Sequence, residues 1–244
     1  MSGVFNRGFL KMGHPVHPIT RDDSLQEMAQ WIEDPELVLI AVGEADVQHI
    51  IADLPSSWHG RTVLLQNELL PKDWESSQLK NPTIISVWFE KKRGQEYKVI
   101  VPSPIFGPKA ELIKNALATL DIPGWIVANE DELLFELVRK NLYILTSNIA
   151  GLALPEGTTV GELTTNHPQL LQSVSSEIME IQYALIGRRL DNTTLNDSMM
   201  LAFKGDLGHQ CMGRSAPARL KRTLELAQKV NIATPSLNQI ANTH

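Results

Sequence analysis

In the first half of the chain, short aliphatic runs alternate with segments whose apolar residues recur every three or four positions. Glu36–Val42 is a continuous aliphatic run that ends at Gly43, and Thr62–Gln66 is a second run followed by Asn67. Such runs are typical of parallel strands that are buried on both faces. The segments between them have the period of amphipathic helices. Strands that alternate with helices in this way indicate an α/β domain.

The other elements of this half follow from the same patterns and from turn residues. Further strands are predicted at Pro15–Thr20, Thr83–Phe89, Tyr97–Val101 and Trp125–Val127. Helices are predicted at Val4–Met12, from Asp22 and Asp23 onward, at Ala45–Leu54 and at Lys109–Leu120. Arg93-Gly94, between two of these strands, is typical of a hairpin-like turn and therefore predicts a mixed sheet.

The second half contains only helical patterns. Its longest is Asp131–Leu154, where aliphatic side chains recur at three- and four-residue steps and acidic residues occupy the first turn. Further helices are predicted at His167–Ile186, Leu195–Ala202, Ala216–Lys229 and Pro235–Ala241. We therefore predict an α/β domain over residues 1–128 and an all-α C-terminal domain over residues 129–244.

Composition narrows the classes of function. The 244 residues are 43% hydrophobic and 20% charged, which is ordinary for a soluble globular protein. The net charge of −6, without a long basic run, argues against nucleic acid as a partner. No apolar run approaches the roughly 20 residues of a membrane span, and no signal-peptide core is present. The single cysteine, Cys211, excludes an intramolecular disulfide. We expect a soluble, cytoplasmic protein.

Lys140 is unusual because it lies inside a strongly apolar helical segment. Seven residues make almost two helical turns, so Lys140 and Ser147 face the same way, with Asn148 beside them. An unpaired ammonium is costly to bury, so Lys140 needs either a partner or a water-filled cleft. The alternative is a lysine that extends along the helix until its amine reaches water.

Several stretches are similar to segments of a known family. They are Ser2-Gly3 at the start, GHPVHPITR (Gly13–Arg21), LLQNELLP (Leu64–Pro71), VRKNLYILTSN (Val138–Asn148) and GRSAPARLKRTLELAQKVNIATPSLNQI from Gly213. By order and spacing they resemble ketopantoate reductase and its relatives in the 6-phosphogluconate dehydrogenase-like superfamily. The resemblance covers nearly the whole chain. It implies that residues 1–128 form a Rossmann-like, mostly parallel sheet domain, incomplete because the first strand and first glycines would precede Met1.

The resemblance implies an NAD(P)H-dependent reductase or dehydrogenase of a small oxo or hydroxy acid. Lys140 would be the general acid that protonates the substrate's carbonyl oxygen, because a lysine removed from water gives up its proton more readily. Asn67 would help to hold cofactor and substrate, next to Lys140 in a crevice between the domains. The cofactor would be NADP, or else NAD, and its binding residues are expected to be Ser2, Gly3, Arg21, Val42 and Gly43. Arg21 would pair with the 2′-phosphate, and its alternative is a surface arginine.

This chain departs from the family pattern near the expected substrate. The family helix continues Lys-x-x-x-Asn-x-x-x-Asn, but Ile144 replaces the first asparagine and Asn148 matches only the second. The family's substrate-anchoring glutamate falls at Ser215 or Ala216, and a lysine is replaced by Gly43. Ketopantoate is therefore not the expected substrate. The expected substrate-binding residues are Ser147, Asn148, Arg214 and Ser215. Alternatively, Ser215 is only an N-cap and Arg214 is solvated.

These departures also favour a second hypothesis, in which the protein has this fold but binds a nucleotide or a protein partner without catalysis. In-frame coding sequence before Met1 that encodes a strand and Gly-x-Gly would favour the enzyme. Without that strand, Pro15–Thr20 and Thr62–Gln66 would face a gap or pair directly, and NADPH would bind weakly. A homodimer is one expected assembly.

Other candidate sites are weaker. His209 and Cys211 are too close together, with no second pair, to form a zinc site, so no metal is expected. Glu177 and Glu180 share a helix face and are either catalytic carboxylates or part of a solvated acidic stripe.

Overall fold

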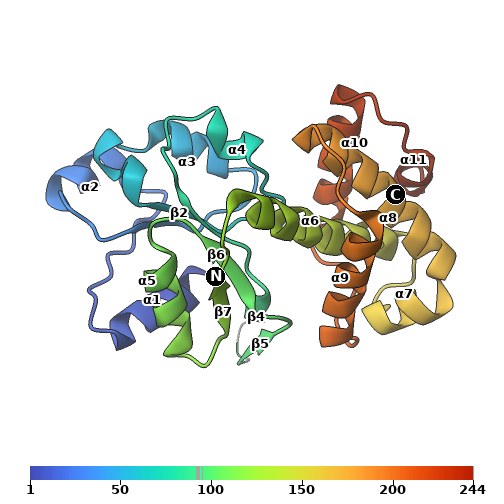
Figure 1. The fold of residues 1–244 in the computed structure, drawn as a ribbon, viewed down its shortest axis with the longest axis horizontal. Coiled ribbons are helices and arrows are strands. Elements are labelled where there is room, and N and C mark those ends of the chain that lie inside the picture. Colours follow the sequence, from blue (N-terminus) through green and yellow to red (C-terminus); the bar gives the residue numbers. More distant parts are fainter. Residues whose placement is uncertain (92–93, 95, 244) are drawn as a thin grey trace. The chain divides into compact units, whose positions relative to one another are not determined.

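The computed structural model describes all residues except 92, 93, 95 and 244. It divides into two compact units, Met1–Leu137 and Val138–His244 (Figure 1). The division falls inside the long helix α6 (Glu130–Leu152), which the sequence predicts over nearly the same residues. The expected domain boundary after residue 128 remains a prediction, because compactness does not show which residues fold independently.

The first unit is built on a mixed five-stranded sheet. The strands are β1 (Val38–Ile40), β2 (Thr62–Leu64), β3 (Thr83–Ile85), β6 (Ser103–Phe106) and β7 (Gly124–Ile126), and they lie in that order across the sheet. β1, β2 and β3 are parallel, whereas β6 runs antiparallel to β3 and parallel to β7. The α/β architecture with a mostly parallel sheet is therefore confirmed.

The predicted strand at Pro15–Thr20 is wrong. This segment carries no sheet pairing among the described residues, and its two prolines, Pro15 and Pro18, lack the N–H groups that a ladder needs. β2 pairs with β1 on one side and with β3 on the other. The expectation that Thr62–Gln66 would face a gap or pair with Pro15–Thr20 is therefore also wrong, and β1 ends the sheet instead.

The segment between β3 and β6 is more broken than the sequence predicts. The single strand expected at Thr83–Phe89 is interrupted, and its end forms β4 (Phe89–Lys91), which pairs antiparallel with β5 (Tyr97–Val99). Arg93 of the predicted turn lies outside the described residues. At the interruption, Trp88 N donates to Ser103 Oγ at 3.0 Å. β6 was not predicted, since Pro104 within it disguises the strand pattern.

Helices cover the sheet of the first unit on both faces (Figure 1). They are α1 (Ser2–Lys11), α2 (Leu25–Trp31), α3 (Val47–Asp53), α4 (Lys72–Glu75) and α5 (Ala110–Ala118), with a 3₁₀ helix at Ser56–Arg61. α1 and α5 pack on one face and form a hydrophobic core with the strands. The two helices approach so closely that a Cβ on Gly8 would lie 2.5 Å from the carbonyl oxygen of Ala116.

The second unit is entirely helical in its described part. After α6 come α7 (Val160–Asn166), α8 (Pro168–Ile186), α9 (Asn192–Gly205), α10 (Ala216–Lys229) and α11 (Pro235–Ala241). All but the short, polar α7 were predicted close to these bounds. None of the described helices is long and apolar enough to cross a bilayer.

A loop that leads into α10 is fixed tightly against α6. A Cβ on Gly151 of α6 would lie 2.8 Å from the Cβ of Cys211, and Cys211 N donates to Thr158 O at 2.9 Å. Burial raises the pKa of the Cys211 thiol to about 11, so the thiol stays protonated at neutral pH. Cys211 is therefore a packing residue that holds the start of α10 in place.

The close crossing of α1 and α5 gives a test of the first unit. Gly8→Ala should lower the free energy of unfolding by about 1–3 kcal/mol, because the added methyl group meets a backbone oxygen that cannot move away freely. Gly3→Ala, in the same helix with no atom within 4 Å of the new Cβ, should be neutral or stabilising by about 0.5–1 kcal/mol. Urea unfolding measures both. Equal effects of the two substitutions would contradict the close packing.

Candidate active site

A buried glutamine connects the carboxyl ends of β1 and β2. Gln66, only 7% exposed, donates from Nε2 to Ile40 O at 2.7 Å and to Val42 O at 3.4 Å. Its Oε1 accepts from Leu65 N at 3.2 Å. The side chain thus satisfies backbone groups that lie beyond the ends of the strands. It fixes the loop after β1 against the loop after β2, at the sheet edge where ligands of open α/β sheets bind.

Asn67 lies at this edge and is also held in place. Its Nδ2 donates to Glu44 Oε1 at 3.0 Å, and Glu44 directly follows Gly43. Glu68 continues the chain with φ 67°, a left-handed conformation that is strained for a residue with a side chain. The structure therefore brings together three of the predicted site residues, Val42, Gly43 and Asn67.

The remaining predicted cofactor residues lie in two other parts of the first unit. Ser2 and Gly3 form the first turn of α1, whose N-terminus has no side-chain cap in the described chain and no acidic residue. Its exposed N–H groups suit an anion. Arg21 is exposed within a turn in which Asp23 Oδ2 accepts from Thr20 N at 2.6 Å and from Thr20 Oγ1 at 2.9 Å. These hydrogen bonds lower the pKa of the Asp23 carboxyl.

The second unit contains the predicted catalytic lysine. Lys140 is only 7% exposed, so the alternative of an amine extended into water does not apply. Its Nζ lies 5.4 Å from the centroid of the Tyr143 ring, a distance at which the ring face attracts a cation. Tyr143 is itself buried against Phe203, with ring centroids 5.1 Å apart. Lys140 and Asn67 belong to different units, and each is placed by its own surroundings.

Two turns further along α6, Asn148 is bound by a residue that the motifs do not predict. Arg219 Nη1 donates to Asn148 Oδ1 at 2.7 Å, and both side chains are buried. Ser147 Oγ is within hydrogen-bonding distance of Tyr143 O at 2.9 Å and Ile144 O at 3.3 Å. The Ser147 hydroxyl proton is therefore used within the helix.

Arg219 could have been found from the pattern of α10. The buried residues of this helix include Ala216, Leu220, Thr223 and Ala227, at the spacing of one helix face. Arg219 lies on the same face, and an arginine among apolar positions needs a polar partner. Asn148 is likewise a polar residue among the apolar positions of α6. The periodicity of each helix does not show that Arg219 and Asn148 are in contact.

Arg214 and Ser215 are exposed at the start of α10. Ser215 occupies the N-cap position, but its side chain makes no cap hydrogen bond among the described residues. The position of Ser215 at the N-cap and the exposure of Arg214 agree with the alternative, in which Ser215 is an N-cap residue and Arg214 is solvated. The neighbouring Gly213 is exposed, and a Cβ there would lie 3.6 Å from Asn148 Oδ1. The loop before α10 thus passes next to Asn148 at Gly213, the residue that precedes Arg214 and Ser215 in the chain.

The paired glutamates of α8 have structural partners. Glu177 accepts from the backbone N–H groups of Ser236 and Leu237, at 2.7 and 3.0 Å, at the start of α11. Glu180 accepts from Arg189 Nη1 at 3.0 Å. Both carboxylates therefore have hydrogen-bond partners, so neither is simply solvated.

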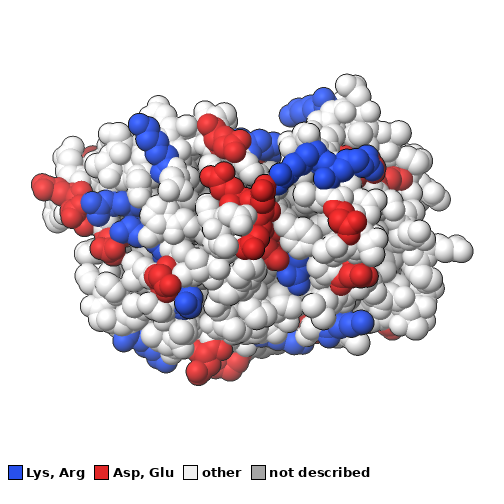
Figure 2. Space-filling view, in the orientation of Figure 1, with Lys and Arg blue, Asp and Glu red and all other residues white. Residues whose placement is uncertain are grey.

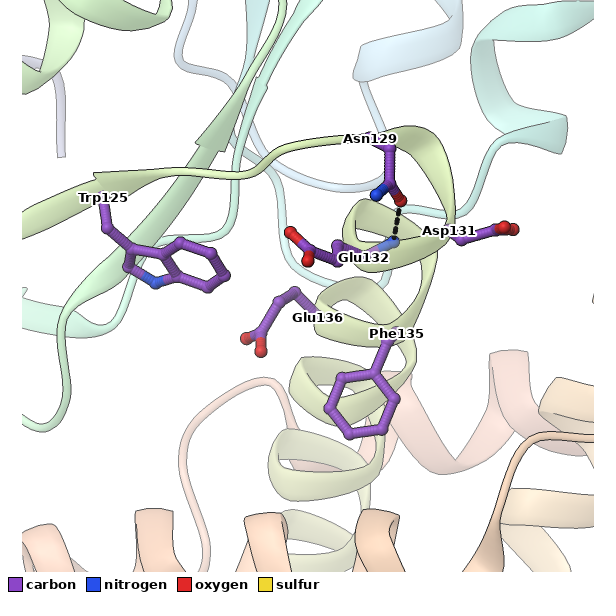
Figure 3. A pocket seen from close by; sticks show the side chains of 6 residues that line it. All are labelled: Trp125, Asn129, Asp131, Glu132, Phe135 and Glu136. Atoms are coloured by element: carbon purple, nitrogen blue, oxygen red, sulfur yellow. Dashed lines mark hydrogen bonds between the residues drawn. The ribbon is translucent and has the colours of Figure 1, made fainter.

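A shallow pocket of about 470 Å³ opens where α6 begins. It is lined by Trp125, Asn129, Asp131, Glu132, Phe135 and Glu136 (Figure 3). Asn129 Oδ1 accepts from Glu132 N at 2.9 Å, which caps the helix. Asp131, Glu132 and Glu136 give the lining three carboxylates, and their negative charge makes the pocket unsuited to phosphate groups. It contains none of the predicted site residues.

The whole chain resembles solved structures of oxidoreductases. The PanE/ApbA family ketopantoate reductase from Ralstonia eutropha JMP134 is 13% identical with a TM-score of 0.64, over 98% of this chain and 90% of that chain. D-mandelate dehydrogenase in complex with NADH is also 13% identical with a TM-score of 0.64, over 99% and 93%. The dimeric ketopantoate reductase from Staphylococcus aureus is 17% identical with a TM-score of 0.54, over 85% and 75%.

No protein-family model and no curated protein matches the sequence. At these identities the structural likeness establishes the fold, which is that of ketopantoate reductases and D-mandelate dehydrogenase. The fold implied by the sequence resemblance is therefore confirmed. The roles of individual residues rest on the geometry described above.

The role of Gln66 at the sheet edge can be tested by stability. Gln66→Leu should lower the free energy of unfolding by about 1–3 kcal/mol, because it removes a buried side chain that satisfies backbone groups of both strand ends. Gln48→Leu is the matched control, since Gln48 also donates to a backbone carbonyl, Asp73 O at 2.8 Å, but is exposed. Its effect should stay within about 0.5 kcal/mol. Equal losses measured by urea unfolding would refute the special role of Gln66.

Proposed function

We propose that this protein is an NAD(P)H-dependent reductase or dehydrogenase of a small oxo or hydroxy acid other than ketopantoate. The observation that carries the proposal is the buried Lys140, placed on the long helix of a fold shared with ketopantoate reductases and with an NADH-bound D-mandelate dehydrogenase. A buried amine on this helix is a candidate for proton transfer, because buried titratable groups are frequent at catalytic sites.

The first unit has residues that fit a dinucleotide. The uncapped first turn of α1, at Ser2 and Gly3, offers N–H groups to a phosphate without a nearby carboxylate in that turn. Arg21 is exposed and offers a guanidinium to the 2′-phosphate of NADP, which makes NADP the proposed cofactor and NAD the alternative. The backbone at Val42 and Gly43 and the amide of Asn67 border the carboxyl edge of β1 and β2, where the nicotinamide half would lie.

In the proposed reaction, Lys140 acts as general acid. The Nζ ammonium donates a proton to the carbonyl oxygen of the oxo acid, which becomes the hydroxyl group of the product. The bound cofactor supplies the hydride that the carbonyl carbon accepts. The sum is oxo acid, NAD(P)H and a proton giving hydroxy acid and NAD(P)⁺, so Lys140 must be reprotonated from solvent after each turnover. The face of Tyr143 stabilises the ammonium form before transfer.

A non-catalytic homologue that binds a nucleotide or a protein is the alternative. It is favoured by Ile144, Ser215 and Ala216, which lack the polar or acidic groups of the family pattern. We also propose a cytoplasmic protein that forms a homodimer, for which the dimeric reductase of Staphylococcus aureus is the structural precedent.

Replacing Lys140 distinguishes the reductase from the non-catalytic alternative. In a screen of 2-oxo acids with NADPH and NADH, Lys140→Ala should lower turnover by about 10²–10⁴-fold, the usual contribution of a general acid. NADPH affinity, measured by nicotinamide fluorescence, should stay nearly unchanged. Lys204→Ala, at the end of α9, serves as the lysine control and should keep wild-type turnover. NADPH binding without reduction of any oxo acid would favour the non-catalytic alternative.

Arg21 provides the test of cofactor choice. Arg21→Ala should weaken NADPH binding by about tenfold or more, the effect of losing a charge-assisted hydrogen bond to the 2′-phosphate. NADH lacks that phosphate, so its affinity should not change. Arg7→Ala, another exposed arginine of the first unit, controls for general charge. If the Arg21 substitution affects both cofactors equally, or neither, the assignment fails.

A further inference from the structure

Helix α9 has two opposite faces that differ in burial. One face packs into the second unit through the buried residues Leu195, Met199, Ala202 and Phe203. The opposite face is exposed and carries Asp197, Leu201 and Lys204, at steps of four and three residues. Leu201 is 60% exposed. A single exposed leucine is ordinary on a protein surface, but the charges on either side of Leu201 distinguish this one.

Asp197 and Lys204 mark the two ends of the exposed face of α9. Seven residues make almost two helical turns, so the two charges lie on one line, with Leu201 between them. They are about 10 Å apart along the helix axis, too far for an ion pair with each other. Neither forms an ion pair with another residue in the described part of the chain. The helix dipole favours Lys204 in the last turn, but Asp197 lies beyond the first turn, where the dipole has little effect.

This order of charges makes the exposed face complementary to a second copy of itself. Two copies of α9 can pack antiparallel around a two-fold axis that passes between Met200 and Leu201. Asp197 of each copy then lies opposite Lys204 of the other, and the exposed Leu201 and half-buried Met200 lie at the centre. A two-fold interface pairs one surface patch with itself. Opposite charges at equal distances from its centre are therefore attractive at both ends.

We propose that two copies of the chain associate through the exposed faces of α9, packed antiparallel, with Asp197 of each copy paired with Lys204 of the other. This rests on the homodimer proposed above and assigns its contact surface. Contact removes the apolar surface of Leu201 from water, while the two ion pairs set the register and direction of the helices.

The surroundings of α9 permit this approach. Figure 2 shows acidic and basic side chains interspersed where α9 lies, without a large patch of either sign. Two copies can therefore meet on this face without strong long-range repulsion. Leu207, just beyond the end of the helix, is 49% exposed and extends the apolar surface. One pair of helices is smaller than a standard interface, so the association is expected to be weak.

Charge reversal tests the pairing of Asp197 with Lys204. Lys204→Asp places aspartates opposite each other at both ends of the interface, and Asp197→Lys does the same with lysines. Each single variant should weaken self-association of the full chain at least about tenfold, because like charges across an interface repel. The double variant, Asp197→Lys with Lys204→Asp, exchanges the partners of both pairs and should associate nearly as well as the wild type. Sedimentation velocity between about 1 μM and about 1 mM measures all four chains.

A mixture of the two single variants gives a second test. The Lys204→Asp chain carries aspartate at both positions, whereas the Asp197→Lys chain carries lysine at both. A mixed pair has an aspartate opposite a lysine at each end, so the two variants should bind each other at least about tenfold more tightly than either binds itself. A variant that had only lost its fold would gain nothing from the mixture.

Control variants separate the pairing from net charge and from folding. Lys221→Asp makes the same charge change on the exposed side of α10 and should leave association unchanged. Leu201→Asn should weaken association without any change in charge, because it removes the apolar centre of the face. Lys204→Ala creates no repulsion and should weaken association only several-fold. The melting temperatures of these chains should stay close to that of the wild type, since the replaced side chains are exposed.

A wild-type chain that stays monomeric over the whole concentration range would overturn the proposal. A dimer that Lys204→Asp leaves intact would also overturn it and would place the homodimer contact on another surface. Weakening by both single reversals, without recovery in the double variant or in the mixture, would show that the charges act only within their own helix. None of these measurements requires cofactor or substrate, so their outcomes are independent of whether the protein is a reductase.

Discussion

The second unit depends on how α6 accommodates polar side chains inside an apolar core. A buried polar group generally requires a partner, and three polar side chains of α6 find one in different ways. Lys140 lies against the ring of Tyr143, Ser147 bonds to the backbone of its own helix, and Asn148 is bound by Arg219 from α10. Because these partners come from fixed positions, the polar stripe has a defined orientation. The polar side chains of α6 therefore form one ordered stripe along the helix.

In the first unit, polar groups at the edge of the sheet are also satisfied by hydrogen-bond partners. A parallel sheet leaves backbone groups unpaired where its strands end, and Gln66 satisfies two of these carbonyls while it holds the neighbouring loops together. Asn67 and Glu44 continue this hydrogen-bonded edge. The strained conformation of Glu68 shows that the turn is imposed by its surroundings. The two units thus differ: the first has a hydrogen-bonded sheet edge, and the second has a buried polar stripe on α6.

Features that depend on burial were predictable, and features that depend on distant partners were not. Aliphatic runs and helical periods identified β2, α6, α8 and α10 because burial leaves a local pattern. The strand at Pro15–Thr20 failed because an apolar pattern does not report missing N–H donors. The role of Arg219 was missed because its partner, Asn148, lies on another helix, and no local period encodes that contact. The family resemblance predicted Lys140 and Asn148 as site residues. Their contacts with Tyr143 and Arg219 are visible only in the structure.

The central claim is that the buried stripe of α6 serves hydride transfer to an oxo acid. The most direct measurement incubates the full chain with a 2-oxo acid and NADPH that carries deuterium at the transferred position, followed by mass spectrometry of the product. The account predicts a 2-hydroxy acid with deuterium on the carbon that bears the hydroxyl group. Recovery of the oxo acid unchanged, although it binds to the protein, would contradict the account.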